Sequence, residues 1–505
     1  MAKTSLLQET SPGTVNIFIN KHNIGADVFI RPFFEGEIYM LFSSIPFLYY
    51  FLPAVLFFYF ISPKALKNTV LLVFSLAFYA WGEPKYVFLM IATVGVNYIL
   101  GLLIEKFRGR WVSKFFVVLS VGASLAVLGY FKYANFFAEN FSALTGISVG
   151  TLNIALPIGI SFYTFQILSY TVDVYRGNVK AQKNPISLGA YIALFPQLIA
   201  GPIVRYSDVE KQLVKRSHSF EKISCGISRF VIGLSKKIIL ANTLGEMCNV
   251  FVNTPDKSVM FYWFYAFCYM LQVYFDFSGY SDMAIGLGKI FGFDFYENFR
   301  YPFVSGSISE FWRRWHISLG TWFRDYVYIP MGGSRVGKAK LFLNIFTVWF
   351  LTGFWHGAEW NFIIWGLFFA VLLTLEKYFL TRRLENTKII NHIYVLFFVA
   401  ISFVIFSASG LSDALGRVGG LFGAGGIPLV SKSFVFNLRN YWFVFVIAAI
   451  GATPLMANIK NKLCQNSKTA AVIEYLEIPV LLVLLIISTA YLADGSFNPF
   501  LYFRF

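Results

Sequence analysis

The sequence predicts an all-helical protein that crosses a membrane many times. Of its 505 residues, 57% are hydrophobic and 13% are charged, and the mean hydropathy is +0.62. Soluble domains carry about 25% charged residues, so this composition excludes both an ordinary soluble enzyme and a disordered chain. A bilayer core of roughly 30 Å needs about 20 apolar residues per helix, and apolar runs recur along the whole chain.

The charge balance agrees with a protein that crosses a membrane many times. The formal net charge of +16 comes from 42 Lys and Arg against 26 Asp and Glu. The basic residues lie in loops between apolar runs, as the positive-inside rule describes, and no nucleic-acid-binding motif accompanies them. We therefore expect membrane lipid, and no nucleic acid, as a partner. The four cysteines lack metal-ligand spacing and a CxxC pair, so neither a metal site nor a disulfide framework is indicated.

Residues 1–39 differ from the rest of the chain. They are polar apart from a patch at Val15–Ile19, which is too short for a signal peptide and lacks its basic flank. The first long apolar run starts directly after Met40. We predict that 1–39 is a mis-called or disordered extension and that 40–505 is a single transmembrane domain.

The apolar segments can be placed in order. They lie near residues 41–61, 69–82, 86–104, 115–131, 152–175, 187–201, 259–275, 280–293, 341–356, 360–380, 390–408, 440–456 and 475–492. Several have only 13–17 residues, which suits tilted, buried or re-entrant helices better than independent spans. We expect about 10–12 transmembrane helices, together with re-entrant and interfacial helices.

Orientation follows from the loops. Ser62–Asn68 and Glu105–Lys114 are rich in Lys and Arg and are expected to be cytoplasmic. Basic residues flank segment 187–201 on both sides, which argues against one clean crossing. That segment contains Pro196 and Gly201, and such helix breakers are tolerated at membrane depth where protein covers them. A re-entrant segment resolves the conflict.

The densest polar stretch is residues 294–335. If this stretch is helical, Trp312, Trp315 and His316 share one face by i,i+3 and i,i+4 spacing, and Arg313 lies three residues before His316. An interfacial amphipathic helix with an aromatic belt and snorkelling arginines explains the same pattern. On spacing alone that structural interpretation is favoured. Arg314 and Arg324 are candidates for contact with phosphates or lipid headgroups.

A second candidate is His356, at the end of an apolar run and between Gly353 and Gly357. Glycine lets another backbone or a substrate approach closely, and a neutral buried histidine can act as a general base. A core histidine bonded to a backbone carbonyl is the equally supported alternative. Glu359 could orient His356, but we favour placing it at the N-terminus of the next helix.

A third cluster is Asp276 and Asp282, which do not share a helical face. Ser278 and Gly279 suggest a break in the helix between them. We favour a packed polar network over a metal site, because no further ligand lies nearby in sequence.

The motifs around the two histidines carry a resemblance. They are Arg300–Phe303, Glu310–Leu319, Trp322–Pro330, Gly332–Arg335 and Thr352–Gly357, with the opening Met40–Ser44 and the closing Asn498–Phe505. This combination resembles the membrane-bound O-acyltransferase (MBOAT) family, in its bacterial branch for O-acetylation of alginate and related polysaccharides. The resemblance runs from about Met40 to the C-terminus.

The resemblance implies a helical shell around a central cavity in a bacterial cytoplasmic membrane. His356 matches the principal catalytic histidine of the family and His316 its second active-site position. The branch moves acetyl groups from a cytoplasmic donor, for which we expect acetyl-CoA, toward an exported polysaccharide such as alginate or peptidoglycan. An extracytoplasmic SGNH-type partner protein is expected to complete the transfer in some members. No permanently bound cofactor and no metal are expected.

Acyl transfer to a hydroxyl needs a base and a group that stabilises the oxyanion. We expect His356 to be the base or a transient acetyl carrier, and His316 to position donor or acceptor. Arg313 and Arg314 are candidates for the phosphates of CoA. The remaining candidates for substrate binding are Trp312, Trp315 and Trp355.

Three rival functions stay open. The first is transfer of D-alanine from a carrier protein toward teichoic acid, which the closing motif disfavours. The second is a transporter with both histidines on a solute path, although the sequence lacks the internal repeats common among transporters. The third is a membrane scaffold without chemistry.

Overall fold

The computed structural model describes residues 40–152, 154–199, 201–495 and 497–499, and this part of the chain contains helices and no strand. The all-helical class is thereby confirmed. The predicted extension at 1–39 lies outside the described residues and stays a prediction.

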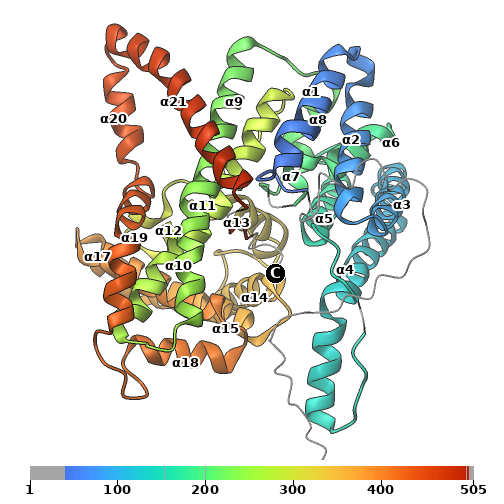
Figure 1. Cartoon of the computed structure of the whole chain (residues 1–505). Helices are drawn as coiled ribbons and strands as arrows, with labels where there is room; N and C mark the ends of the chain where they lie inside the picture. Colours follow the sequence, from blue (N-terminus) through green and yellow to red (C-terminus); the bar gives the residue numbers. More distant parts are fainter. Residues whose placement is uncertain (1–39, 153, 200, 496, 500–505) are drawn as a thin grey trace, which may run out of the picture. The chain divides into compact units, whose positions relative to one another are not determined.

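The first half of the chain forms eleven numbered helices (Figure 1). They are α1 (Leu52–Ile61), α2 (Lys67–Gly82), α3 (Tyr86–Lys106), α4 (Trp111–Thr145), α5 (Ile160–Arg176), α6 (Pro185–Ala193), α7 (Phe195–Leu198), α8 (Tyr206–Val214), α9 (Phe220–Ser235), α10 (Asn242–Asn253) and α11 (Val259–Ile290). The apolar runs predict most of them. They miss α8, α9 and α10, because charged and polar residues interrupt the apolar run of each.

The second half carries both candidate histidines. Its helices are α12 (Ile308–Arg314), α13 (Ile317–Phe323), α14 (Lys338–His356), α15 (Trp360–Leu375), α16 (Thr381–Glu385), α17 (Ile390–Ser407), α18 (Leu411–Leu421), α19 (Lys432–Gly451), α20 (Leu455–Leu463) and α21 (Ser467–Ala493). Short π or 3-10 turns are Phe47–Phe51, Lys64–Leu66, Lys236–Ala241, Pro302–Val304, Arg324–Tyr328 and Glu376–Leu380.

Several helices are long and apolar enough to cross a membrane. Within the described residues seven qualify, at Lys64–Gly82, Tyr86–Lys106, Trp111–Thr145, Trp360–Glu385, Ile390–Ser407, Lys432–Gly451 and Ser467–Ala493. They make the chain a multi-pass membrane protein. The expected number of ten to twelve crossings stays a prediction.

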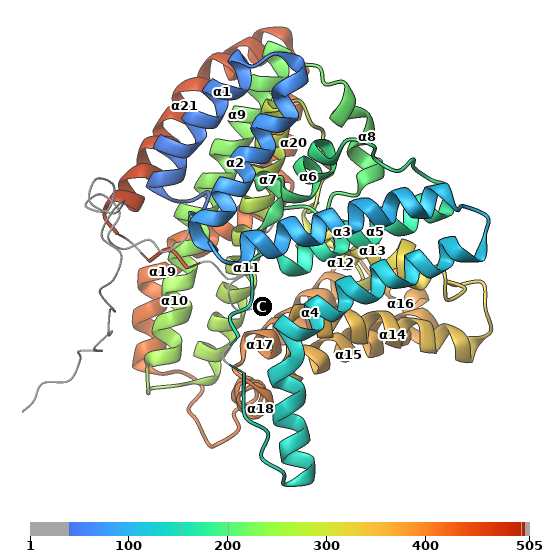
Figure 2. The same ribbon diagram turned by 90° about the vertical axis from the view of Figure 1, so that its right-hand side faces the viewer.

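Helix α4 is longer than its apolar run. The run predicts an end near residue 131, whereas the helix continues through Lys132 to Thr145 and ends at Gly146 in the left-handed region, with φ 72°. A left-handed glycine is a common helix stop. Lys132 therefore interrupts the apolar pattern without interrupting the helix, which packs against α3 and α5 (Figure 2).

The predicted re-entrant segment is a broken helix inside the protein. Helix α6 ends at Ala193, Leu194 leaves the helical conformation, and the short α7 follows. Gln197, on α7, donates from Nε2 to the carbonyl of Tyr191 at 2.6 Å, and its side chain is buried. Protein thus covers the broken backbone, as irregular structure at membrane depth requires.

The predicted break at Ser278 and Gly279 is wrong. Helix α11 runs continuously to Ile290, and α9 packs along it. A Cβ added at Gly279 would lie 2.7 Å from the carbonyl oxygen of Gly233 on α9, and a Cβ at Gly233 2.6 Å from that of Gly279. The glycine permits close packing of two backbones instead of ending the helix.

The carboxylates on α11 form the expected polar network. Asp276 lies 2.5 Å from Lys237, and both side chains are buried. One turn and a half further on, Asp282 accepts ion pairs from Arg229 at 2.8 Å and from Lys236 at 2.7 Å. Each carboxylate neutralises basic groups of α9 or of the turn that follows it, and this explains why two charged side chains lie on α11.

Helices α14 and α15 form a hairpin and lie side by side in both views (Figures 1 and 2). The contact depends on glycine. A Cβ at Gly353 would overlap the carbonyl of Phe362, and a Cβ at Gly357 would overlap its ring. The predicted close approach at these glycines is therefore confirmed: the backbone of α15 approaches Gly353, and the Phe362 ring approaches Gly357.

We expect Gly353→Ala to destabilise the protein by about 1–3 kcal/mol, the usual cost of overpacking. Thermal unfolding followed by size-exclusion chromatography measures the change. Gly95→Ala on α3 is the matched control, because a Cβ there meets no atom within 4 Å and alanine favours the helix. Equal midpoints for Gly353→Ala and wild type would contradict the packing described here.

Candidate active site

His356 is the last residue of α14 and lies among aromatic rings. Its ring centroid is 5.0 Å from that of Trp355, 5.0 Å from that of Trp365 and 5.3 Å from that of Phe406, each steeply tilted to it. Gly357 then leaves the helix in an extended conformation. Trp365, on α15, was not predicted, because in sequence it is one apolar residue within an apolar run.

Two side chains of α4 hold the end of α14 through three hydrogen bonds. The Tyr133 hydroxyl donates to the carbonyl of Phe354 at 2.7 Å. The Lys132 amino group donates to the carbonyls of Trp355 at 2.5 Å and His356 at 3.2 Å. Sequence analysis missed Lys132, although a lysine within a long apolar helix is itself a signal of function.

His316 does not lie on a helical face with Trp312 and Trp315, so that prediction is wrong. Helix α12 ends at Arg314, and His316 takes the left-handed conformation, with φ 43°, before α13 begins. The amide of Ile317 bonds the carbonyl of Asn298 at 3.0 Å, so the segment after α11 pairs with this turn and stops the helix.

The turn sends the two tryptophans to different neighbours. Trp312 packs edge-on against Trp349 at 4.5 Å and near Trp365 at 5.7 Å. Trp315 stacks on Phe311 and packs against Phe299, away from the histidine at the end of α14. Of the predicted substrate-binding residues, Trp312 therefore lies beside the site and Trp315 is part of the adjoining core.

Asn298 fixes the ring of His316. Its Oδ1 accepts from the amide of Ser318 at 3.1 Å and from the Ser318 hydroxyl at 2.9 Å, and it lies 3.3 Å from His316 Nδ1. A backbone N–H can only donate, so the amide oxygen of Asn298 faces this cluster and His316 Nδ1 carries the hydrogen. His316 Nε2 is then a hydrogen-bond acceptor.

We expect Asn298→Ala to lower the acyl transfer that the resemblance implies about 10- to 100-fold, the loss usual for partners that orient a functional histidine. The initial rate of acyl transfer, at matched protein level, measures it. Asn298→Asp keeps the acceptor oxygen and is expected to retain more activity than the alanine variant. Equal rates in the alanine variant and wild type would show that His316 needs no such partner.

The two histidines flank one tryptophan. The Trp355 ring lies 6.2 Å from that of His316 and 5.0 Å from that of His356. The structure thus brings together three of the predicted site residues, from the α12–α13 turn and the end of α14. The ring of Trp355 stacks on Phe165 of α5, at 5.4 Å, and this contact fixes its plane.

Buried polar atoms without hydrogen-bond partners lie around His316 and His356. Within the described part of the chain, they are His316 Nε2 and the indole Nε1 atoms of Trp312, Trp355 and Trp365. Buried polar groups are otherwise almost always hydrogen-bonded. One acceptor and three donors, all unused and close together, are the pattern expected of a site that binds a polar substrate.

A cavity of about 420 Å³ reaches His316. Its lining includes Trp312, Arg313, Thr321, Arg324 and Thr352. Apart from Ser309 and His316, the rest of its wall is apolar.

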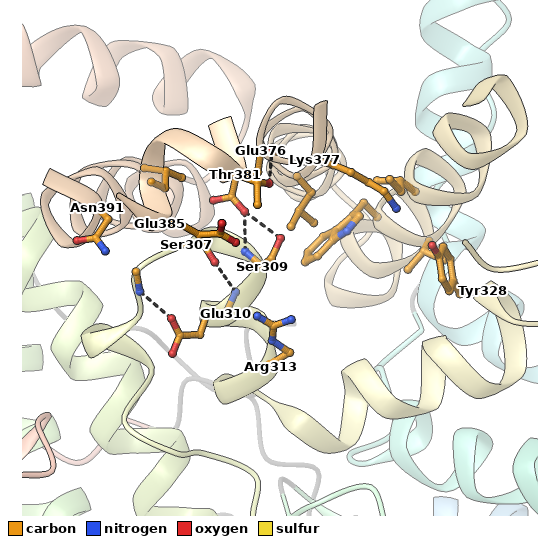
Figure 3. A pocket seen from close by; sticks show the side chains of 16 residues that line it. Ser307, Ser309, Glu310, Arg313, Tyr328, Glu376, Lys377, Thr381, Glu385 and Asn391 are labelled. Atoms are coloured by element: carbon orange, nitrogen blue, oxygen red, sulfur yellow. Dashed lines mark hydrogen bonds between the residues drawn. The ribbon is translucent and has the colours of Figure 1, made fainter. Parts of the chain in front are cut away.

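A larger pocket of about 670 Å³ adjoins this cavity and shares Ser309, Arg313, Val348 and Trp349 with it. In Figure 3 the side chain of Arg313 lies in this pocket, below the polar cluster around Glu376. Lys377 of the segment after α15 lines the same pocket. The two spaces together connect a polar mouth, where Arg313 and Lys377 lie among three glutamates, with His316.

Arg314 faces a different cavity. That space, of about 420 Å³, is lined by Arg314, Arg229, Arg300 and Asn298 among others. Arg314 is also paired with Glu310 at 2.7 Å. Burial raises the pKa of Glu310, but the bond from the Gly306 amide and the Arg314 charge outweigh it, so its pKa lies below the usual range. The neighbouring arginines therefore do not share one site.

The remaining predictions are placed as follows. Glu359 stands at the N-cap position of α15, as expected. In the described residues no group of three or more His, Cys, Asp or Glu side chains gathers as a metal site would require.

Comparison with known proteins supplies the family. Residues 180–412, which include both histidines, match the membrane-bound O-acyltransferase family. The probable alginate O-acetylase AlgI of Azotobacter vinelandii is 38% identical over 499 residues, covering 92% of this chain and 100% of that protein.

Two further relatives have related activities. The peptidoglycan O-acetyltransferase of Helicobacter pylori is 33% identical, over 78% of this chain and 82% of that protein. The teichoic acid D-alanyltransferase of Bacillus subtilis is 31% identical, over 50% of this chain and 69% of that protein. The chain therefore belongs to the membrane-bound O-acyltransferase family and is a multi-pass membrane O-acyltransferase.

Proposed function

We propose that the protein transfers acetyl groups from cytoplasmic acetyl-CoA to hydroxyl groups of an exported polysaccharide. The observation that carries the proposal is the set of unpartnered polar atoms around His316, Trp355 and His356, together with a cavity that reaches His316 and is lined by Arg313 and Arg324. Relatives named as acetylases of alginate and peptidoglycan, which align over most of the chain, support the acetyl group and the polysaccharide acceptor.

In this proposal His356 removes the proton of the attacking hydroxyl. The hydroxyl oxygen forms the new C–O bond at the acetyl carbonyl carbon, the C–S bond breaks, and the proton passes from His356 to the departing thiolate. A base positioned in this way contributes about 10²–10⁴-fold to the rate. The indole N–H groups of Trp355 and Trp365 lie beside His356 and are suited to stabilise the oxyanion.

His316 takes a binding role in this scheme. Because Asn298 holds the hydrogen on Nδ1, Nε2 can accept a hydrogen bond from a substrate hydroxyl or amide. Arg313, at the junction of the two cavities, is suited to a phosphate of CoA, whereas Arg314 is already paired with Glu310. We therefore assign donor binding to Arg313 rather than to both arginines.

An extracytoplasmic SGNH-type protein is part of the proposal as the partner that completes transfer of the acetyl group to the polysaccharide. The second candidate function is D-alanyl transfer from a carrier protein, which the Bacillus subtilis relative favours. That relative aligns over half of this chain, whereas the acetylase relatives align over most of it. Acetyl transfer is therefore the better-supported reaction.

The donor can be tested by measuring the thiol released on acyl transfer. Purified protein in detergent is given a soluble oligosaccharide acceptor and either acetyl-CoA or D-alanine linked to a carrier protein. We expect free CoA thiol, with ester formation, from acetyl-CoA alone. Turnover of the carrier-linked D-alanine without turnover of acetyl-CoA would replace this proposal with the second candidate.

A further inference from the structure

Helix α4 contacts the backbone of α14 at three successive carbonyls. Tyr133 bonds the carbonyl of Phe354, and its ring stacks on the Phe354 ring with centroids 4.0 Å apart and planes 10° apart. Lys132 bonds the next two carbonyls, those of Trp355 and His356. About two turns further along α4 than Tyr133, Asn140 accepts the indole N–H of Trp360 at 2.8 Å.

These carbonyls are the ones that a helix leaves without partners at its C-terminal end. The next amide, Gly357, reaches back only to Gly353, at 3.4 Å. The negative end of the helix dipole favours a cationic donor at such a place. A leucine would pack there at lower cost, because a lysine within a membrane helix is expensive unless its amino group is used.

We infer that Lys132 is a positioning residue for His356, an inference that rests on the proposed role of His356 in acyl transfer. Its amino group bonds the carbonyl of His356 itself and that of the preceding residue, so it fixes the backbone from which the imidazole projects. It also lies 5.8 Å from the centre of the Trp355 ring, the ring between the two histidines. Lys132 thus couples α4 to the geometry of the reacting group without touching the substrate.

This role makes a specific prediction about kinetics. Misplacing a reacting group by about 1 Å costs on the order of 10²-fold in rate. Lys132→Met should lower kcat about 10- to 100-fold and change the KM for acetyl-CoA less than about twofold. Lys132→Arg, which keeps a cationic donor, should retain most of the kcat.

Tyr133→Phe is the matched control on the same helix. It removes one bond, to a carbonyl two residues before His356, and keeps the ring stacked on Phe354. We expect it to lower kcat less than about threefold. Wild-type kcat in Lys132→Met, a loss confined to KM, or an equal loss in Tyr133→Phe would overturn the inference.

If Lys132→Met does not fold, a second measurement tests the inference. Lys132→Ala is assayed with and without ethylammonium, which can occupy the space of the missing amino group. We expect at least a tenfold recovery of kcat, and no recovery would overturn the inference. Failure of the proposed function is distinguishable, because then the wild-type protein itself forms no acetyl ester from acetyl-CoA, and both proposals fall together.

Discussion

Replacing His356 with alanine should reduce acetyl transfer about 10²–10⁴-fold, the contribution of a general base. At about 1.36 kcal/mol per factor of ten, this is about 2.7–5.4 kcal/mol of barrier. The neighbouring Trp355, Trp365 and Phe406 give the alanine variant no substitute base. Initial rates of ester formation, at matched protein level in the membrane, measure the effect.

His218→Gln is the control for this experiment. His218 bonds the hydroxyl of Tyr59 at 3.0 Å in the loop before α9 and belongs to none of the cavities described above. The rate of ester formation by His218→Gln should equal that of wild type. A His356→Ala protein with a normal rate would remove this histidine from the mechanism.

Replacing Lys237 with methionine should destabilise the protein by about 3–5 kcal/mol, the cost of leaving a buried charge unpaired. Lys237 is 2% exposed and Asp276 is 5% exposed, with 2.5 Å between their charged groups. Lys237 also donates to the carbonyl of Pro499. The predicted effect is a strongly lowered unfolding temperature, measured by intrinsic fluorescence in detergent.

The double variant Lys237→Met, Asp276→Asn separates the two contributions. Removing the charge of Asp276 as well should restore more than half of the lost stability, since the uncharged Met and Asn side chains leave no unpaired buried charge. The remaining loss reports on Pro499, whose neighbour Asn498 bonds Asn242 at 3.1 Å and the carbonyl of Ser43 at 2.8 Å. If Lys237→Met were as stable as wild type, the Lys237–Asp276 pair would contribute nothing to stability.

The same contacts explain why the opening and closing motifs of the sequence accompany each other. Asn498 bonds Ser43, so residues about 450 positions apart meet at the α10 side of the protein. Both motifs contribute to the resemblance, but the sequence assigns them no common role. Their meeting is tertiary structure that no local pattern predicts.

Hydrophobic periodicity predicts the helices well where apolar runs are long, as in α3 and α17. It fails where tertiary contacts decide. Gly279 looks like a break and is instead a close contact with Gly233. Similarly, i,i+3 spacing placed His316 on a helical face, whereas pairing with Asn298 turns the backbone there into the left-handed region.

For the same reason, the sequence predicts some residues of the candidate site and not others. His316, His356 and Trp355 could be selected from sequence, because polar groups and family motifs mark them. Asn298 and Lys132 act through hydrogen bonds to partners 18 and 224 positions away, respectively, and only the fold shows those partners. Lys132 carried a usable signal, its charge within an apolar helix, and Asn298 carried none.

The most direct test of the account follows label across a bilayer. Vesicles holding wild-type or His356→Ala protein receive [¹⁴C]acetyl-CoA on the cytoplasmic face, with polysaccharide or the partner protein enclosed on the other side. We predict esterified label on the enclosed acceptor with wild type and background label with His356→Ala. Equal labelling by both proteins, or none by wild type with donor and acceptor present, would contradict acetyl transfer by this site.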